Sequence, residues 1–292
     1  MKVGMNLLLW TGHVTEAHVP ILQALKHTGF DGVEVPLFDP SDPGHYRRLG
    51  AILDDIGLER TAVALIPDEA HSPISADPAV RQAGFEHLAR VIDCCAALGT
   101  DLVCGPWYQP LGVFSGQGPT LQEYERCAEV HKRIAPLAHD AGVTCTLEVL
   151  NRFECYLLNT CEQAIGFFDL LGEPNFGIHF DTFHANIEEK DSVAAVQQAW
   201  ASGHLKHVHI SENDRGTPGK GQARIRETIA ALKVLGYDDW LTIEAFGGTL
   251  GIRDQGLLES ALGMPRATFG GQFVHESLFA MAAAYAFHIA EN

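Results

Sequence analysis

The sequence predicts a single (β/α)8 TIM barrel, and three observations support this fold class. Short β-rich runs alternate with amphipathic helical stretches along the chain, which is typical of parallel β/α units. Glycines stand between many helical stretches and the strands that follow, as expected for residues that end helices in a left-handed conformation. The length of 292 residues, 46% of them hydrophobic and 20% charged, fits one well-cored barrel domain.

Eight such runs can be counted, which is the number that closes a barrel. The predicted strands are Val3–Trp10, Asp31–Val35, Arg60–Leu65, Asp101–Cys104, Val143–Val149, Phe176–Asp181, Leu205–Ile210 and Trp240–Phe246. The clearest predicted helices between them are Pro78–Leu98, Leu121–Ala141, Cys161–Leu171 and Ser192–Ala201. An open doubly wound sheet is the alternative, but no G-x-G-x-x-G follows an early strand to favour it.

No linker, charge run or change of composition divides the chain, so residues 1–292 are expected to form one domain. The stretch 247–271 has no clear periodicity and is predicted to be a long loop, followed by a last helix at about 273–289. Long loops in compact domains often serve as lids or oligomer contacts. With the apolar residues of this tail, that favours a homodimer or homotetramer.

Charge and cysteine usage narrow the cellular setting. A formal net charge of −17 repels nucleic-acid backbones and anionic lipid, so neither nucleic acid nor membrane is an expected partner. No segment is long and apolar enough to cross a bilayer, and Met1–Trp10 lacks the cleavage pattern of a signal peptide. The seven cysteines show no C-x-x-C spacing, which indicates reduced thiols and a cytoplasmic protein.

The ends of the last four predicted strands each carry a residue that can bind a metal: Glu148, Asp181, His209 and Glu244. Their separations of 33, 28 and 35 residues each match about one β/α unit. Equivalent positions on successive barrel strands face the same place, and barrel enzymes form their active sites at the C-terminal mouth. A single residue of this kind would more often be a hydrogen-bonded barrel residue, but four in register favour a common site.

Three carboxylates and one imidazole at one point would repel one another without a cation. This oxygen-rich donor set suits Mn²⁺, Co²⁺ or Mg²⁺ better than a structural zinc, and Mn²⁺ is the expected ion.

Polar residues just beyond these strand ends are candidates for binding a ligand's hydroxyl groups: Glu154, His184 and Arg215, all expected on loops. Taken singly, each is more often a solvated loop residue. His179, His207 and Glu34 lie in predicted strands and are either partners of the metal ligands or satisfied core residues. Trp10 and Trp107 are candidate apolar walls for a ligand, with ordinary packing as the alternative.

The segment Gly216–Gly221 is rich in glycine and follows strand seven, where barrel enzymes often bind phosphate. It lacks the spacing of a P-loop, and an ordinary loop is the favoured interpretation.

Three strings around these residues resemble the ketose 3-epimerases, the group of D-tagatose, D-allulose (psicose) and L-ribulose 3-epimerases within the xylose-isomerase-like barrel superfamily. They are Leu147–Glu154, Asp181–Glu189 and His207–Arg215. The resemblance extends over nearly the whole chain to about residue 246. It implies that Glu148, Asp181, His209 and Glu244 bind the metal and that Glu154, His184 and Arg215 bind substrate oxygens. The chain departs from the family pattern at Ala245, where a proline is usual, and in the tail from Gly247.

We therefore expect inversion at C3 of a free keto-sugar such as L-ribulose, D-tagatose, D-fructose or D-allulose. Glu148 and Glu244 would flank the sugar, one removing the C3 proton and the other returning a proton to the opposite face. A metal chelating O2 and O3 would stabilise the enediolate that forms between these steps. His184 and Arg215 are expected to hold O2 and polarise the carbonyl, while Glu154 binds a hydroxyl.

Three other functions compete with this one. An aldose–ketose isomerase would use the same metal and glutamates to move a proton between C1 and C2. An abasic-site endonuclease would need several zinc ions and a basic face, which the net charge of −17 argues against. A catalytically silent sugar-binding protein would bind the ketose without turnover.

Overall fold

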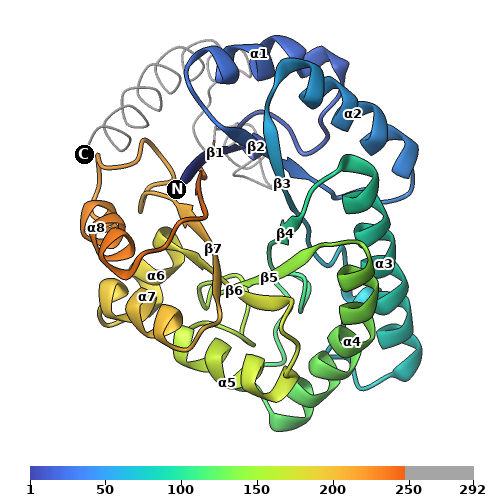
Figure 1. The fold of residues 1–292 in the computed structure, drawn as a ribbon. Helices are drawn as coiled ribbons and strands as arrows, with labels where there is room; N and C mark the ends of the chain where they lie inside the picture. Colours follow the sequence, from blue (N-terminus) through green and yellow to red (C-terminus); the bar gives the residue numbers. More distant parts are fainter. Residues whose placement is uncertain (247–292) are drawn as a thin grey trace, which may run out of the picture.

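The computed structural model describes residues 1–246, which form a closed barrel of parallel strands with each strand hydrogen-bonded to the next and β8 to β1 (Figure 1). The strands are β1 (Lys2–Asn6), β2 (Gly32–Pro36), β3 (Glu59–Val63), β4 (Leu102–Cys104), β5 (Thr144–Glu148), β6 (Phe176–Asp181), β7 (Leu205–Ile210) and β8 (Trp240–Ile243). The predicted (β/α)8 barrel is confirmed. The predicted loop at 247–271 and helix at 273–289 lie outside the described residues.

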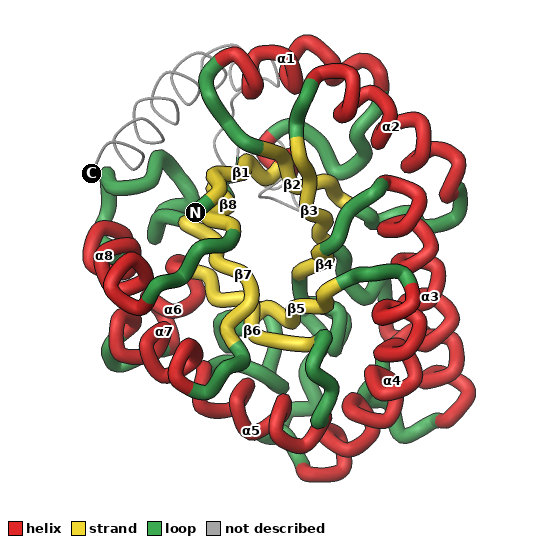
Figure 2. The backbone as a smooth tube through the Cα atoms, viewed as in Figure 1, coloured by secondary structure: helices red, strands yellow, loops and turns green. Residues whose placement is uncertain are grey.

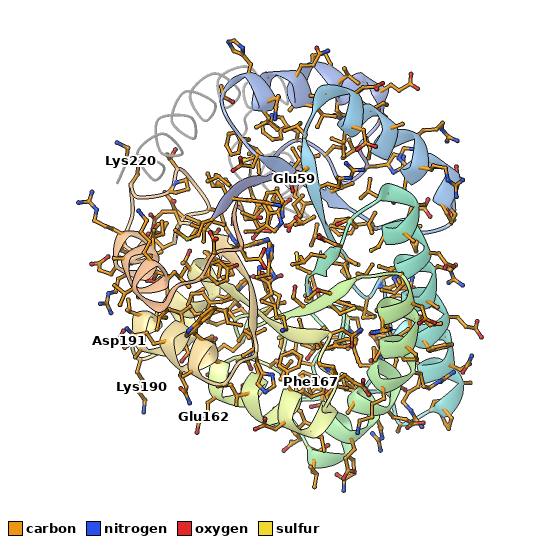
Figure 3. The ribbon with its side chains drawn as sticks, viewed as in Figure 1. Glu59, Glu162, Phe167, Lys190, Asp191 and Lys220 are labelled. Atoms are coloured by element: carbon orange, nitrogen blue, oxygen red, sulfur yellow. The ribbon has the colours of Figure 1, made fainter. Side chains whose placement is uncertain are left out.

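Helices surround the strands as an outer ring (Figure 2). They are α1 (Val19–His27), α2 (Pro43–Ile56), α3 (Pro78–Leu98), α4 (Leu121–Asp140), α5 (Cys161–Leu171), α6 (Thr182–Glu188), α7 (Ser192–Ala201) and α8 (Ile225–Leu235), with short 3-10 helices η1 (Leu7–Leu9), η2 (Glu16–His18) and η3 (Glu69–His71). Figure 3 shows the resulting polarity, with Glu162 and Lys190 pointing outward and Phe167 of α5 pointing toward the barrel. None of the described helices is both long and apolar enough to span a membrane.

Local signals in the sequence explain where α3 begins and ends. The Asp77 side chain accepts a hydrogen bond from the Ala79 amide, which caps the first turn, and Pro78 occupies the first helical position. Gly99 adopts a left-handed conformation with φ 74°, and its amide bonds back to the carbonyls of Cys95 and Ala96. The predicted bounds of this helix are confirmed.

Two local expectations need correction. The first strand ends at Asn6 and does not continue to Trp10, because the Asn6 side chain accepts a hydrogen bond from the Leu8 amide and starts the 3-10 helix η1. His184 lies on helix α6 and not on a loop, because Asp181 caps a helix that begins immediately after β6.

Part of the barrel interior is polar, which is unusual for strands that are buried on both faces. The strand register places Asn6 of β1 beside Glu34 of β2, and Glu34 beside Thr61 of β3. Two histidines, His179 of β6 and His207 of β7, are likewise in register. All five side chains are at most 1% exposed, so each needs a partner within the protein. This polar layer is the floor of the candidate site.

Candidate metal centre and active site

The structure brings the four predicted ligands together at the C-terminal mouth of the barrel. Glu148 ends β5, Asp181 ends β6, His209 lies in β7, and Glu244 directly follows β8. One ligand atom from each of the four lies within 4.8 Å of the others. The side chains come from consecutive strands, and the register of β6 and β7 sets Asp181 directly beside His209. All four are at most 5% exposed.

The two ring nitrogens of His209 face different neighbours. Nδ1 lies 3.6 Å from Glu244 Oε1 and 3.9 Å from an Asp181 carboxylate oxygen, and it has no hydrogen-bond partner among the described residues. Nε2 faces Glu34 in the barrel interior, 2.7 Å from Oε1. A buried nitrogen without a partner, aimed at a group of carboxylates, suits coordination to a cation. The donor set therefore fits a divalent ion held by three carboxylates and one imidazole.

Crowding of negative charge perturbs the carboxylates. Burial and the charge of Glu244 raise the pKa of Glu148 to about 8. Burial also raises the pKa of Asp181, to about 6, although Arg215 and His184 oppose that change. For Glu244, burial is outweighed by the nearby Arg215 and His209, and its pKa falls to about 2. Such divergent values are typical of functional sites, and a bound cation would relieve the repulsion that causes them.

Arg215 supplies positive charge to this cluster from the loop after β7. Its Nη1 donates to Glu244 Oε2 at 2.5 Å and to Asp181 Oδ2 at 3.1 Å. Its guanidinium also lies over the rings of Phe183 and Phe246, at 3.7 and 4.8 Å from their centres. The backbone of Arg215 has a φ of 56°, a left-handed conformation that residues other than glycine seldom adopt. Strain of this kind is typical of functional loops.

His184 and Glu154 complete the polar lining. His184 Nε2 lies 3.3 Å from Glu148 Oε1 and 3.0 Å from Arg215 Nη2, while its Nδ1 accepts the Asn151 amide. Glu154, in the loop after β5, accepts a hydrogen bond of 2.7 Å from the Asn151 side chain. Both residues border a cavity of about 90 Å³ together with Glu148, Glu244 and Arg215. The residues predicted to bind a ligand are thus adjacent to the four predicted metal ligands.

The apolar wall of this cavity differs from the predicted one. It is formed by residues that include Leu8, Phe38, Leu111, Leu150 and Phe246. Trp107 and Trp10, which the sequence suggests as wall residues, do not border this cavity.

Trp107 is fully buried and packs against His131 and Phe176, and its Nε1 donates to the Thr146 carbonyl at 3.0 Å. Trp10 is half-buried and packs on the edge of the main core. Both positions correspond to the packing alternative. The sequence does not separate a cavity wall from ordinary packing, because an aromatic residue after a strand can serve in either role.

In the glycine-rich segment Gly216–Gly221, the amides of Gly216, Gly219 and Lys220 already donate hydrogen bonds within the protein. The buried Glu212 carboxylate accepts hydrogen bonds from the amides of Gly219, at 2.9 Å, and Ala223, at 2.8 Å. An internal carboxylate thus binds two backbone amides in and just after this segment. This agrees with the ordinary loop that the sequence favours.

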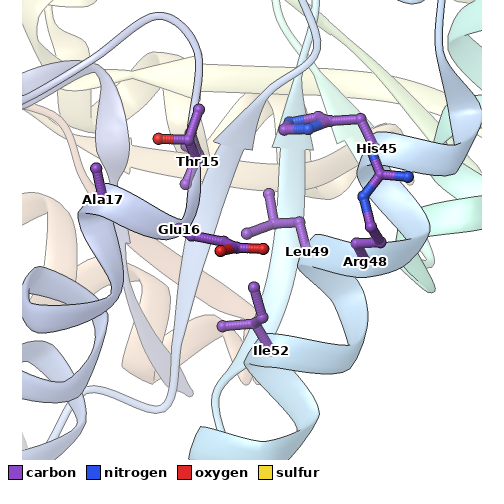
Figure 4. Close-up of a pocket in the computed structure, with 8 residues that line it drawn as sticks. Thr15, Glu16, Ala17, His45, Arg48, Leu49 and Ile52 are labelled. Atoms are coloured by element: carbon purple, nitrogen blue, oxygen red, sulfur yellow. The ribbon is translucent and has the colours of Figure 1, made fainter.

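A second cavity lies between η2 and α2, where Glu16 faces Leu49 and Ile52 (Figure 4). Its lining contains none of the predicted site residues. The seven cysteines are all free, which agrees with the predicted reduced thiols, and all are buried.

Sequence reasoning missed Asn6 and left Glu34 undecided. Asn6 Nδ2 donates to Glu34 Oε1 at 2.9 Å and to Glu244 Oε1 at 3.1 Å. Burial by itself raises the pKa of Glu34, but His209 and His207 lower it well below its usual range. The signal available in the sequence was the polar character of both residues within otherwise apolar strands.

Comparisons with known proteins agree with this geometry. The family model described as "Xylose isomerase-like TIM barrel" matches residues 22–266. A ketose 3-epimerase of Arthrobacter globiformis is 35% identical over 86% of this chain and 85% of its own length.

Two solved structures extend the likeness to three dimensions. An L-ribulose 3-epimerase gives a TM-score of 0.85 at 31% identity, covering 100% of this chain and 95% of the other. The D-allulose 3-epimerase of a Methylomonas species, solved in complex with D-allulose, gives 0.79 at 30% identity, covering 90% and 89%. The chain belongs to the xylose isomerase-like TIM barrel family and, within it, to the ketose 3-epimerases, which are isomerases.

Proposed function

We propose that this protein is a divalent-metal-dependent 3-epimerase of a free, non-phosphorylated keto-sugar. The observation that carries the proposal is the convergence of Glu148, Asp181, His209 and Glu244, whose ligand atoms lie within 4.8 Å of one another. Mn²⁺ is the proposed ion, with Co²⁺ and Mg²⁺ as the alternatives to assay. L-ribulose, D-tagatose, D-fructose and D-allulose are the proposed substrates.

The proton transfers are assigned to the two glutamates. A bound divalent ion would supply Lewis-acid polarisation of the sugar's carbonyl and neighbouring hydroxyl. Glu148 and Glu244 extend from strands on different sides of the mouth, and both border the cavity. One glutamate, ionised, removes the proton from C3, and the other, carrying a proton, delivers that proton to C3 from the opposite face, which inverts that carbon; the first group then holds the proton taken from C3 and the second regains one from solvent. Each positioned acid or base of this kind contributes about 10²–10⁴-fold.

The neighbouring residues bind and orient the sugar. Arg215 and His184, which contact each other at 3.0 Å, are placed to donate hydrogen bonds to O2. Glu154, fixed by Asn151, is placed to accept a hydrogen bond from a hydroxyl further along the sugar. Phe38, Leu111 and Phe246 offer an apolar surface to its carbon atoms and help to exclude water from the reacting centre.

The charge of the mouth supports a neutral substrate. Three carboxylates, those of Glu148, Glu154 and Glu244, border the cavity, and Glu212 already accepts hydrogen bonds from the backbone amides of Gly219 and Ala223 in the loop after β7. A phosphorylated sugar would therefore meet repulsion without gaining those amide hydrogen bonds. A homodimer or homotetramer stays a prediction, which light scattering after size-exclusion chromatography would test.

Incubation of each ketose in heavy water with Mn²⁺, Co²⁺ or Mg²⁺ tests the proposed reaction. Epimerisation requires deuterium at C3, whereas an aldose–ketose isomerase would label C1 or C2. Glu244→Gln is expected to lose at least about 100-fold in kcat while it keeps its fold, because one proton-transfer group is gone. Glu227→Gln, an exposed carboxylate of α8, is the matched control and should retain full activity. Label at C1 or C2 alone, or undiminished turnover by Glu244→Gln, would refute the proposal.

A further inference from the structure

Glu34 lies in the barrel interior, where its carboxylate is contacted by five polar side chains. It is fully buried in the middle of β2. Its two oxygens are approached by polar groups from four other strands: Asn6 Nδ2 at 2.9 Å, Thr61 Oγ1 at 2.9 Å, Cys104 Sγ at 3.2 Å, His207 Nε2 at 3.0 Å and His209 Nε2 at 2.7 Å. A carboxylate with this many donors is held in one position.

The contact with His209 fixes which ring nitrogen is available for a metal. Glu34 accepts hydrogen bonds, so the nitrogen that faces it must carry the proton. That nitrogen is Nε2, and the lone pair is left on Nδ1, which faces Glu244 and Asp181. A carboxylate behind a metal-bound histidine sets both the ring orientation and its basicity in this way.

A second connection runs from Glu34 to Glu244 through Asn6. The Asn6 Oδ1 atom accepts the Leu8 amide at 2.8 Å, so its Nδ2 must face the interior. From there Nδ2 donates to Glu34 and to Glu244 Oε1, at 2.9 and 3.1 Å. Glu34 therefore supports two of the four ligands, one directly and one through a single amide.

We propose that Glu34 is a positioning residue that holds His209 and, through Asn6, Glu244 in the geometry that binds the metal. The inference rests on the proposed metal-dependent function and adds a residue outside the four ligands to it. Glu34 contacts neither the substrate cavity nor the other ligand atoms directly, so its effect passes through its neighbours.

A competing interpretation is a second ion at Cys104, His179, His207 and His209, whose ligand atoms also lie within 4.8 Å of one another. The hydrogen bonds argue against it. His207 and His209 both direct Nε2 at Glu34, and Cys104 directs its thiol at the same carboxylate. These groups are arranged as donors around one anion, and burial raises the pKa of the Cys104 thiol well above its usual value.

Glu34→Gln tests the proposal on metal-stripped, full-length protein. Titration calorimetry with Mn²⁺ should give one ion per chain for the wild type and about 10- to 100-fold weaker binding for the variant. Glu59→Gln removes an equal charge from an exposed position at the start of the adjacent strand β3 and should bind as the wild type does (Figure 3). Thr61→Val removes one hydrogen bond to Glu34 and should weaken binding by a smaller factor.

A spectroscopic measurement separates positioning from general support of the fold. In the Mg²⁺-loaded wild type, the ring N–H protons of His207 and His209 should give slowly exchanging, strongly downfield signals. Both should move upfield in Glu34→Gln and stay unchanged in Glu59→Gln, while circular dichroism of both variants matches the wild type.

The outcomes are distinct. If the wild type binds Mn²⁺ and Glu34→Gln binds it equally tightly, the positioning role is wrong and the proposed function stands. If the wild type binds no divalent ion, both are wrong. If Glu34→Gln does not fold, Thr61→Val decides, and undiminished Mn²⁺ affinity in that variant overturns the proposal. Two Zn²⁺ ions per chain would favour the second-ion interpretation and also overturn it.

Discussion

The affinity of the metal-free protein for Mn²⁺ is predicted to rise steeply with pH. Glu148 has a pKa raised to about 8, because its burial and the charge of Glu244 penalise the ionised form. A metal ion binds the ionised form of this side chain. Each ion that binds at a pH below about 8 therefore displaces a proton from Glu148. Well below that pKa, one displaced proton lowers Kd about tenfold for each unit that the pH rises, and between pH 6 and pH 8 the factor is about 50, because Glu148 is already half-ionised at pH 8.

His209 adds to this dependence. Burial lowers the pKa of its imidazole, but Glu34 and Glu244 outweigh that effect and raise it well above its usual value. A second proton is therefore displaced over part of the range, and the factor of about 50 is a lower bound. The charge of Arg215 persists throughout, because its pKa is raised further by Glu244 and Asp181.

The same shift has a consequence for stability. Since the folded-state pKa of Glu148 lies above its usual value of 4.5, the folded state binds this proton more tightly than the unfolded chain does. The resulting stabilisation of the metal-free protein is complete below pH 4.5 and is lost as the pH rises through about 8. The increase in Tm on adding Mn²⁺ should accordingly be larger at pH 8 than at pH 6.

Calorimetric titration at several pH values, in two buffers of different ionisation enthalpy, measures both Kd and the number of protons released. Glu148→Gln is the informative variant: its affinity is lower at every pH, and its proton release is smaller by one. An identical Kd at pH 6 and pH 8, with no release of protons, would refute the electrostatic account of the site.

Two further predictions concern residues beside the site. Trp107→Phe should lower the free energy of unfolding by about 1–3 kcal/mol, since a buried hydrogen bond to Thr146 is lost. Its KM should not change, because Trp107 does not border the cavity; an increased KM with unchanged stability would restore its predicted role as a wall. Glu212→Ala should destabilise the fold by about 1–3 kcal/mol in denaturant titration and raise KM, because the loop that carries Arg215 loses its central acceptor. Unchanged stability would contradict that role.

Much of the fold was predictable because its signals are local. The bounds of β6, β7, α3, α5 and α7 agree with those predicted from the spacing of apolar residues and the glycines that follow helices. Helix α6 was not predicted, because its seven residues are too few to show a helical period. The apolar run after β1 was assigned to the strand because nothing in its composition distinguishes a 3-10 turn from an extended segment.

The candidate site was predictable where topology alone determines proximity. Residues at the ends of successive parallel strands must converge, so Glu148, Asp181 and His209 could be grouped from spacing alone. The role of Glu34 could not, because its partners come from four other strands, and only the barrel's closure and register determine which of them reach it. Pairings at long sequence separation of this kind leave no periodic pattern in the sequence.

The negative charge at the mouth has two effects that favour the same class of ligand. Glu148, Asp181 and Glu244 share a buried space, which destabilises the site without a cation and attracts one strongly. One divalent ion and Arg215 together supply three positive charges, which balance the three carboxylates. A neutral sugar leaves that balance unchanged. A phosphate would upset that balance, and the nearby amides of Gly219 and Ala223 already bind Glu212. On the proposed function, we therefore expect this arrangement of charge to disfavour binding of phosphorylated ketoses, before any difference in reactivity at C3 applies.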